Sequence, residues 1–277
     1  MLVSIIILNY NTFELTCSCI RSIYEETKNV DFEIIVVDNA STLDEPDKFL
    51  ALFPKIKLIK NKENRGFAGG CNDGIKVAKG DTILLLNSDT KLLNDAITIT
   101  YNFLKTHPEV GIATCRLENT DGSPQSNCQP FPSIKLMMLE YGRIHKLFGK
   151  RKRSKIWMGP YFSYDTTLFP DWIWGTFFMF PRMLLKIFPE NKLPETFWMY
   201  VEDMEWCWLA HKAGYKIAFV HEGKVLHLGG VSSRTTDIKM NMMSENFKKF
   251  YTIYYGKIYS SILLWLLNVL NNSKLHS

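Results

Sequence analysis

The amino-acid sequence predicts an α/β fold with a doubly wound, mostly parallel central sheet and helices on both faces. Short apolar runs alternate with amphipathic stretches through the first 115 residues, as in strands joined by crossover helices. The run at residues 83–86 has no polar alternation, so we expect a strand buried on both faces. Asn87, Ser88 and Asp89 follow it directly, at the sheet edge where open α/β folds bind ligands.

The remaining elements follow from periodicity and from stop and start signals. In the first half we expect a strand at 2–8, a helix at 12–26 capped by Thr12, strands at 33–37 and 56–59, a helix after the glycine-rich stretch 64–74, a helix at 95–106 and a strand at 110–114. In the second half we expect loops and a hairpin at 116–170, a strand at 172–180, helices at 182–188 and from Glu202 to the cap Gly214, and strands at 216–220 and 224–228.

Composition excludes several classes of protein. The net charge of +5 (33 basic minus 28 acidic residues) is too small to indicate nucleic-acid binding. Six cysteines without a paired spacing indicate reduced core thiols in a cytosolic protein. A basic cluster is expected to be a solvated loop or a seat for anionic lipid head groups, and its residues are Lys146, Lys150, Arg151, Lys152, Arg153 and Lys155.

The last forty residues carry an aromatic stripe between 247 and 259, followed by a nearly continuous apolar run at 262–270. That run is shorter than the roughly 20 residues needed to span a bilayer. With lysines on its flank, the segment favours a helix at a membrane surface or against a partner. The alternative is a terminal helix packed on the protein's own core.

Four polar residues stand at expected strand ends or helix starts, namely Asp38, Asp89, Asp203 and His227. A carboxylate after a buried strand can ligate a divalent cation, which in turn can hold a diphosphate. The alternative for 87–89 is a turn in which Asp89 caps the helix that starts near residue 94. A nicotinamide dehydrogenase is excluded, because the first loop lacks a glycine fingerprint.

Six motifs in chain order resemble the inverting family 2 glycosyltransferases with the GT-A fold, and most of all the bacterial rhamnosyltransferases of polysaccharide assembly. The resemblance covers about residues 1–235. The motifs are Ile7-Leu-Asn-Tyr-Asn11, Val36-Val-Asp-Asn-Ala-Ser41, Asn64-Arg-Gly-Phe-Ala-Gly-Gly-Cys-Asn72, Leu86-Asn-Ser-Asp89, Val201-Glu-Asp203 and His227-Leu-Gly-Gly-Val-Ser-Ser233.

We expect the chain to consist of three parts, of which the resemblance implies the first two. Residues 1–115 would form the nucleotide-sugar-binding half and residues 116–235 the acceptor-binding and catalytic half of one GT-A domain. The resemblance ends there, and the aromatic and apolar pattern of residues 236–277 predicts a helical tail that associates with the membrane.

For the donor, the resemblance implies that Asp38 accepts a hydrogen bond from a pyrimidine N3–H while Asn9 and its loop line the base. Gly66 would let the backbone approach the sugar-nucleotide closely. Arg65 would offset diphosphate charge, with a surface salt bridge as an equal alternative.

Asn87 and Ser88 would also contact the donor. Asp89 would bind Mg²⁺ or Mn²⁺, and His227 would serve as an imidazole ligand or as a hydrogen-bond donor to the diphosphate. Asn87 departs from a full Asp-x-Asp, which leaves one carboxylate instead of two on the cation.

For catalysis, the resemblance implies that Asp203 takes the proton of the acceptor hydroxyl. Glu202 would bind the acceptor or orient Asp203, and Trp174 and Gly175 would form the acceptor floor. Without the resemblance, Glu202 and Asp203 are better explained as acids that favour and cap a helix amino terminus.

The implied activity is a metal-dependent, inverting transfer of a sugar to a saccharide acceptor during cell-surface polysaccharide assembly. Rhamnose from dTDP-rhamnose is the first expectation, ahead of UDP-linked sugars. An acceptor linked to a polyprenyl diphosphate at the inner face of the cell membrane would suit the basic cluster and the tail. The alternative is a non-catalytic sugar-nucleotide-binding or scaffold subunit.

Overall fold

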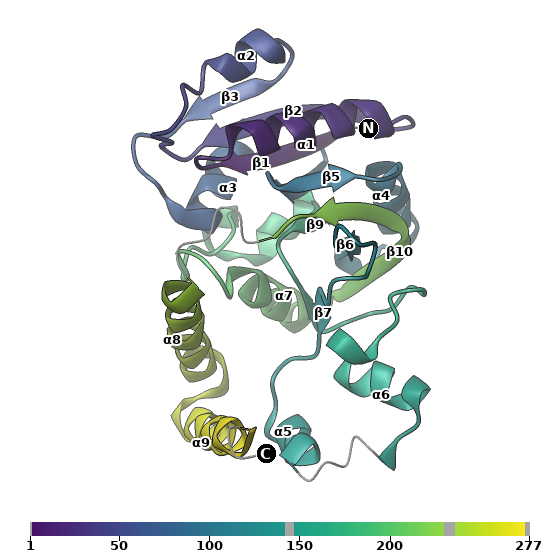
Figure 1. Cartoon of the computed structure of the whole chain (residues 1–277), viewed down its shortest axis with the longest axis vertical. Helices are drawn as coiled ribbons and strands as arrows, with labels where there is room; N and C mark the ends of the chain where they lie inside the picture. Colours follow the sequence, from purple (N-terminus) through teal and green to yellow (C-terminus); the bar gives the residue numbers. More distant parts are fainter. Residues whose placement is uncertain (1, 142–146, 230–235, 275–277) are drawn as a thin grey trace.

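The computed structural model describes residues 2–141, 147–229 and 236–274 (Figure 1). Its core is an eight-stranded, mixed but mostly parallel sheet in the order β3-β2-β1-β4-β9-β6-β10-β5, which confirms the predicted fold class. The strands are β1 Leu2–Asn9, β2 Asp31–Asp38, β3 Lys57–Lys60, β4 Thr82–Asn87, β5 Thr90–Leu92, β6 Val110–Glu118, β9 Phe177–Pro181 and β10 Lys216–His227. A second sheet pairs β7 Cys128–Gln129 with β8 Trp172–Ile173.

Helices cover both faces of the large sheet. They are α1 Phe13–Glu26, α2 Lys48–Leu52, α3 Gly66–Val77, α4 Ala96–Thr106, α5 Ile134–Tyr141, α6 Lys150–Trp157, α7 Glu202–Lys212, α8 Thr236–Tyr255, α9 Lys257–Lys274 and the 3₁₀ turns η2 Gly159–Tyr161, η3 Arg182–Ile187 and η4 Pro189–Asn191. Successive side chains of a strand point to opposite faces of the sheet, so the buried residues form a separate core on each face. In β1, Ile5 and Ile7 pack with α1 and α4, whereas Ile6 packs with α3 and α7.

Strand register sets the position of the polar strand ends. β1 pairs in parallel with β2 and with β4, so Asn9 lies opposite Asp38 and Leu8 lies opposite Asn87. β10 runs antiparallel to β5, and this pairing places His227 opposite Thr90. The carboxyl ends of β1, β2, β4 and β10 therefore meet at one edge of the sheet.

The second half differs from the sequence expectation in three places. The expected strand at 172–180 is split into β8 and β9, because the backbone between them leaves the sheet and bonds to Asn127, Asn87 and Asp203. The expected strands at 216–220 and 224–228 are one strand, β10, with a register shift between Val220 and Lys224. The expected loop at 116–170 contains α5 and α6, and 182–188 is a 3₁₀ turn.

The local signal for α5 is a serine cap. Ser133 Oγ accepts a hydrogen bond from the Leu136 backbone N–H at 3.2 Å, as a helix N-cap does. The expected cap Thr12, in contrast, makes no capping hydrogen bond to α1. Its hydroxyl lies 3.0 Å from Ser88 Oγ instead, so Thr12 belongs to the polar edge of the sheet.

All six cysteines are free and buried, as expected for reduced core thiols. Burial raises the pKa of the Cys19 thiol to about 12, which keeps it protonated. The basic cluster folds as α6 and not as a loop. Lys146 lies outside the described residues, as do the side chains of Lys150, Arg151 and Lys155.

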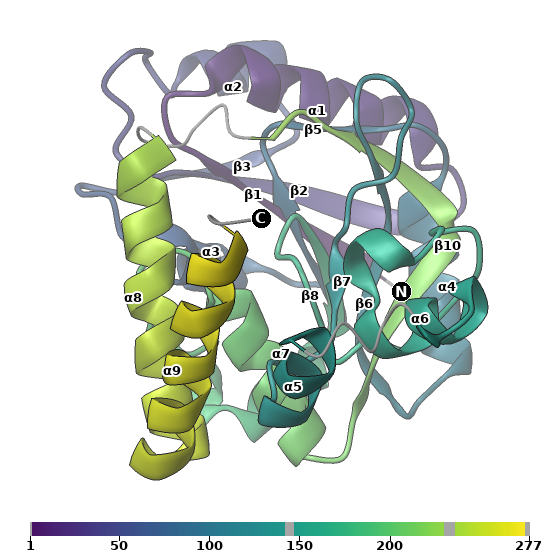
Figure 2. The same cartoon turned by 60° about the horizontal axis from the view of Figure 1, so that its bottom comes forward.

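The tail forms two helices (Figure 2): α8 packs against Trp208 of α7, and α9 packs against α8 and α5. Phe250 and Tyr251 of α8 are buried with Phe197 and Met204, so the expectation that the aromatic stripe faces a membrane is wrong for these two residues. Their burial fits the alternative of a helix packed on its own core. Among the described helices, none combines the length and apolarity that a membrane crossing requires.

Phe250→Ala should lower the free energy of unfolding by about 3–5 kcal/mol, because a fully buried phenylalanine leaves a cavity. Ile253→Ala is the matched control on the same helix, since Ile253 is 48% exposed. Its change should stay within about 0.5 kcal/mol. Urea denaturation of both variants measures the difference, and equal effects would show that α8 does not belong to the cooperative core.

Candidate active site

A buried carboxylate occupies the end of β2. Asp38 Oδ1 accepts a hydrogen bond from Asn9 Nδ2 at 2.7 Å, and Asp38 Oδ2 accepts one from the Ser41 backbone N–H at 3.0 Å. Each carboxylate oxygen has a second lone pair, so Asp38 can still accept a hydrogen bond from a ligand. The hydrogen bonds from Asn9 and Ser41 fix the orientation of the Asp38 carboxylate toward such a ligand.

A chain of side-chain hydrogen bonds connects Asp38 to the turn at 87–89. Asn9 Oδ1 accepts hydrogen bonds from Thr16 Oγ1 at 2.8 Å and from Thr12 Oγ1 at 3.1 Å. Thr12 Oγ1 in turn lies 3.0 Å from Ser88 Oγ. Asn9 is thus a positioning residue for Asp38 as well as a residue beside it.

Asp89 faces an imidazole and does not cap a helix. Its Oδ1 lies 3.4 Å from His227 Nε2, and both side chains are nearly buried. The helix that follows, α4, is capped by Asp95, whose carboxylate accepts from the Thr98 backbone N–H. The turn expected at 87–89 is present, but the capping role proposed for Asp89 is wrong.

Gln125 fixes the tautomer of His227. Its Nε2 donates to the His227 carbonyl at 2.8 Å, so its Oε1 is the atom that lies 2.7 Å from His227 Nδ1. An amide oxygen only accepts, and Nδ1 therefore carries a proton. In the neutral ring, Nε2 then directs a lone pair toward Asp89. Sequence reasoning missed Gln125, because it lies in the segment expected to be loop and hairpin.

The residues present fit a divalent cation. Two ligands at about 2.1 Å from an octahedral ion stand about 3 Å apart, close to the separation of Asp89 Oδ1 and His227 Nε2. An imidazole whose other nitrogen donates to an amide is the usual arrangement of a metal ligand. Within the described residues no group of three or more potential side-chain ligands occurs, so a diphosphate and water would complete the coordination.

Asp203 is held by two backbone N–H groups at the start of α7. Its Oδ2 accepts from Gly175 at 2.9 Å and its Oδ1 from Met204 at 2.8 Å. Tyr200 and Val201 both have positive φ angles, +67° and +77°, and these uncommon conformations turn the chain into the helix. Strained backbone of this kind concentrates at functional sites.

Desolvation raises the pKa of the Asp203 carboxyl to about 6, although the hydrogen bonds from Gly175 and Met204 oppose the shift. The neighbouring Glu202 is 6% exposed, and burial together with the Asp203 charge raises its pKa well above the ordinary value. Because the pKa of Glu202 is raised further by the charge of its neighbour, the negative charge of the pair is favoured on Asp203. A carboxylate with a pKa near 6 is a suitable proton acceptor at neutral pH.

The remaining residues predicted for the acceptor side lie in different surroundings. Gly175 lies against Asp203, because a Cβ on it would be 3.1 Å from Phe67 and 3.7 Å from the Asp203 Cβ. Trp174 is half-buried and packs against the core on the α1 side of the sheet. The carboxyl of Glu202 is buried, which favours a role beside Asp203 over direct contact with an acceptor.

Arg65 and Gly66 have structural partners of their own. The Arg65 guanidinium is paired with Asp73 and, at 3.3 Å, with Glu195, which is the salt-bridge alternative for this residue. Gly66 has φ +71°, and a Cβ on it would lie 2.1 Å from the Trp198 carbonyl oxygen. Close packing against residue 198 therefore explains this glycine.

Two contacts join the parts of the candidate site. The Asn87 backbone N–H donates to the Thr176 carbonyl at 3.0 Å, next to the Gly175 N–H that binds Asp203. The Leu228 N–H donates to the Asp89 carbonyl at 3.0 Å. The end of the last sequence motif, at 230–233, lies outside the described residues.

A model of the family described as glycosyl transferase family 2 matches residues 4–170. The poly(ribitol-phosphate) beta-glucosyltransferase of Bacillus spizizenii is 33% identical over 132 residues, which are 46% of this chain and 21% of that protein. The poly-beta-1,6-N-acetyl-D-glucosamine synthase of Staphylococcus aureus is 27% identical over 218 residues, 76% of this chain and 45% of that protein. The chain thus spans less than half the length of these two relatives.

Among solved structures, the mannosyltransferase PcManGT from Pyrobaculum calidifontis in complex with GDP-Man and Mn²⁺ has a TM-score of 0.61. The match covers 94% of this chain and 67% of that chain at 16% identity, so it is evidence for the GT-A fold. The family model covers more than half of the sequence. The chain therefore belongs to glycosyl transferase family 2.

Proposed function

We propose that the protein is an inverting glycosyltransferase that moves a sugar from a nucleotide diphosphate to a saccharide acceptor. The observation that carries the proposal is the Asp203 carboxylate, which two backbone N–H groups hold at the start of α7. Its pKa of about 6 suits a general base at neutral pH. Asp38, Asp89 and His227 supply donor-side groups at neighbouring strand ends.

In this mechanism the acceptor oxygen attacks the anomeric carbon from the face opposite the diphosphate. The new bond joins the acceptor oxygen to the anomeric carbon, the bond to the diphosphate oxygen breaks, and the hydroxyl proton moves to Asp203. The Gly175 N–H fixes the Asp203 oxygen Oδ2. Glu202, held neutral by burial, leaves the negative charge on its neighbour.

For the donor we propose a pyrimidine nucleotide. Asp38 is acceptor-only when ionised, so it favours uracil or thymine, which carry N3–H, over cytosine. The two relatives are named for glucosyl transfer and for synthesis of a poly-N-acetylglucosamine. These names favour UDP-linked hexoses, beside the dTDP-rhamnose that the sequence motifs implied.

For the metal we propose Mg²⁺ or Mn²⁺ held by Asp89 and His227, with Gln125 orienting the imidazole. The mannosyltransferase with the similar fold is titled as a complex with Mn²⁺. A divalent cation at this position would offset the negative charge of the nucleotide diphosphate. Asn87 and Ser88 would line the donor beside it.

For the acceptor we propose a saccharide of a cell-surface polymer, as the names of both relatives suggest. The second candidate, a non-catalytic scaffold, is supported by Asn87 in place of an aspartate. It is disfavoured because the carboxylates and the histidine are present together with their orienting hydrogen bonds. We retain the division into 1–115, 116–235 and 236–277 as part of this proposal.

We also propose that α9 contacts the inner face of the cell membrane, with the protein peripheral and cytoplasmic. Ile258, Ile262 and Trp265 recur at helical spacing and are 81%, 44% and 63% exposed. The basic helix α6 and α5 lie in the same lower part of Figure 1 as α9. Lys257, at the start of α9, is exposed as well, and exposed apolar residues with a flanking cation are typical of an interfacial helix on anionic lipid.

Asp203→Asn should lower the transfer rate by roughly 10²–10⁴-fold, because an amide cannot accept the acceptor proton. UDP affinity should stay at the wild-type value, since Asp203 shares no hydrogen-bond partner with Asp38. The transfer rate is measured with a panel of radiolabelled sugar nucleotides and corrected for their hydrolysis. Calorimetric titration with UDP measures the affinity. Asp165→Asn, which changes an exposed carboxylate, is the control and should leave both unchanged.

The same assignment fixes the direction of the pH dependence. The base must be ionised, so kcat/KM of the wild type should fall about tenfold per pH unit below pH 6 and level off above it. A flat profile across that range, or full activity in Asp203→Asn, would remove Asp203 from the role of base.

Replacing both Ile258 and Trp265 by Ser should reduce binding to vesicles that contain phosphatidylglycerol, because the exposed apolar area of α9 is lost. Leu43→Ser is the control, since Leu43 is 74% exposed and precedes α2 at the opposite end of the molecule (Figure 1). Co-flotation measures the bound fraction. Equal flotation of wild type and double variant would contradict membrane contact through α9.

A further inference from the structure

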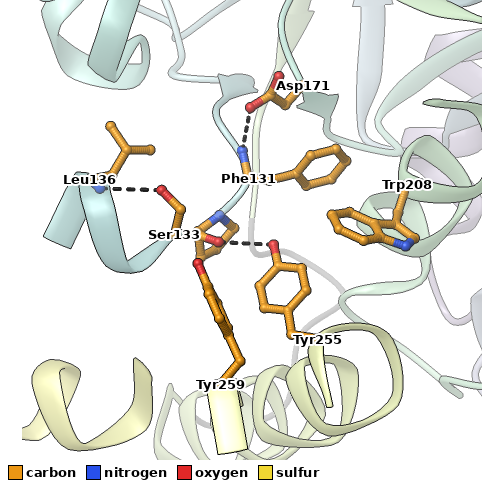
Figure 3. A pocket seen from close by; sticks show the side chains of 8 residues that line it. Phe131, Ser133, Leu136, Asp171, Trp208, Tyr255 and Tyr259 are labelled. Carbon is orange, nitrogen blue, oxygen red and sulfur yellow. Dashed lines mark hydrogen bonds between the residues drawn. The ribbon is translucent and has the colours of Figure 1, made fainter. Parts of the chain in front are cut away.

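An open cavity of about 450 Å³ lies between α5, α7 and the α8–α9 corner, outside the catalytic residues described above (Figure 3). This volume falls within the range of small-molecule pockets, roughly 300–1,000 Å³. We call it the aromatic pocket, and its lining is Phe131, Pro132, Ser133, Leu136, Asp171, Trp208, Tyr255 and Tyr259.

The tail helices build one wall of the aromatic pocket. Gly256, with φ +81°, makes the corner between α8 and α9. The ring centroids of Tyr255 and Tyr259, on either side of this corner, are 5.2 Å apart. Trp208 lies 5.0 Å from the Tyr255 ring, and Phe131 meets Trp208 edge-on at 4.9 Å. The result is a continuous aromatic wall on one side of the cavity (Figure 3).

Two hydroxyl groups of the lining keep unused hydrogen-bonding capacity among the described residues. Tyr259 Oη and Ser133 Oγ each accept one bond from a backbone N–H, at 3.1 and 3.2 Å, and still hold a hydroxyl hydrogen to donate. Asp171 Oδ2 accepts from the Phe131 N–H at 2.7 Å, and its other carboxyl oxygen points away from the other lining side chains (Figure 3). Tyr255, in contrast, already donates to the Pro132 carbonyl.

This combination distinguishes between two kinds of ligand. A hydrocarbon chain would cover the hydroxyls of Tyr259 and Ser133 without accepting their hydrogens, which is unfavourable. A sugar ring presents an apolar C–H face to an aromatic wall and hydroxyls at its edge to donors and acceptors. The mixture of aromatic faces with a few convergent polar groups fits the sugar.

The aromatic pocket lies near Asp203 but does not overlap it. Trp208 is five residues after Asp203 on α7, and Asp171 is four residues before Gly175, whose N–H binds Asp203. Helix and strand rises give a separation on the order of 10 Å. One monosaccharide cannot reach both places, whereas an oligosaccharide can.

We propose that the aromatic pocket binds a sugar unit of the saccharide acceptor, distant from the unit that receives the transferred sugar. The inference rests on the proposed glycosyltransferase function and adds an acceptor subsite to it. It also assigns a task to α8 and α9, which would complete the acceptor-binding surface.

The test compares wild type with two variants of α5 on a printed array of bacterial surface glycans. Leu136→Trp should block the pocket and lower glycan retention at least tenfold. Met138→Trp is the matched control, because Met138 is 51% exposed on the same helix, and it should retain glycans like wild type. Tyr259→Phe should lower retention about tenfold, because it removes a hydroxyl donor and keeps the aromatic ring of the wall.

UDP titration of every variant separates the two hypotheses. If UDP binds to all proteins but wild type retains no glycan, or if Leu136→Trp retains the same glycans as wild type, the subsite proposal is wrong and the proposed function stands. If UDP fails to bind to wild type, the proposed function itself fails. Dodecanol binding is titrated in parallel. If dodecanol binds to wild type and not to Leu136→Trp while glycan retention is the same in both, the pocket binds a hydrocarbon and the proposal is overturned.

Discussion

The parallel pairing of β1 with β2 and β4 is the constraint on which the candidate site depends. It ends three strands at one edge, so that Asn9 meets Asp38 and the turn at 87–89 follows beside them. A one-residue slip of register would turn these polar side chains into the opposite face of the sheet. Both faces of β1 are buried, because Ile5 and Ile6 belong to different cores, so the apolar side chains alone do not fix the register. The hydrogen bond from Asn9 to Asp38 favours the observed pairing.

Three carboxyl groups of the candidate site lie in different environments, and each environment suits a different task in the proposed mechanism. Asp38 is held by side-chain and backbone donors and is suited to accept a hydrogen bond. Asp89 shares its surroundings with an oriented imidazole, which suits a cation. Asp203 combines desolvation with two N–H donors, which keeps its pKa near neutrality and suits proton transfer. The fold supplies these differences through burial and through backbone groups at strand and helix ends.

Local patterns were sufficient to predict the sheet, the position of Asp38 and Asp89 after strands and the start of α7 at Glu202. They were insufficient where tertiary contacts decide the outcome. Gln125 meets His227 across 102 residues of sequence, and Arg65 meets Glu195 across 130. The aromatic stripe of the tail has the same pattern whether it faces lipid or protein, and the burial of Phe250 depends on Phe197 and Trp208.

The central claim is that the strand ends form one nucleotide and metal site. Calorimetric titration of UDP with and without Mn²⁺ tests it most directly. The account predicts that UDP binds more tightly with Mn²⁺ and more tightly than CDP. Gln125→Leu should weaken the Mn²⁺ affinity about 10–100-fold, while Gln129→Leu, a glutamine of β7, should not. A UDP affinity that neither Mn²⁺ nor His227→Ala changes would contradict the account.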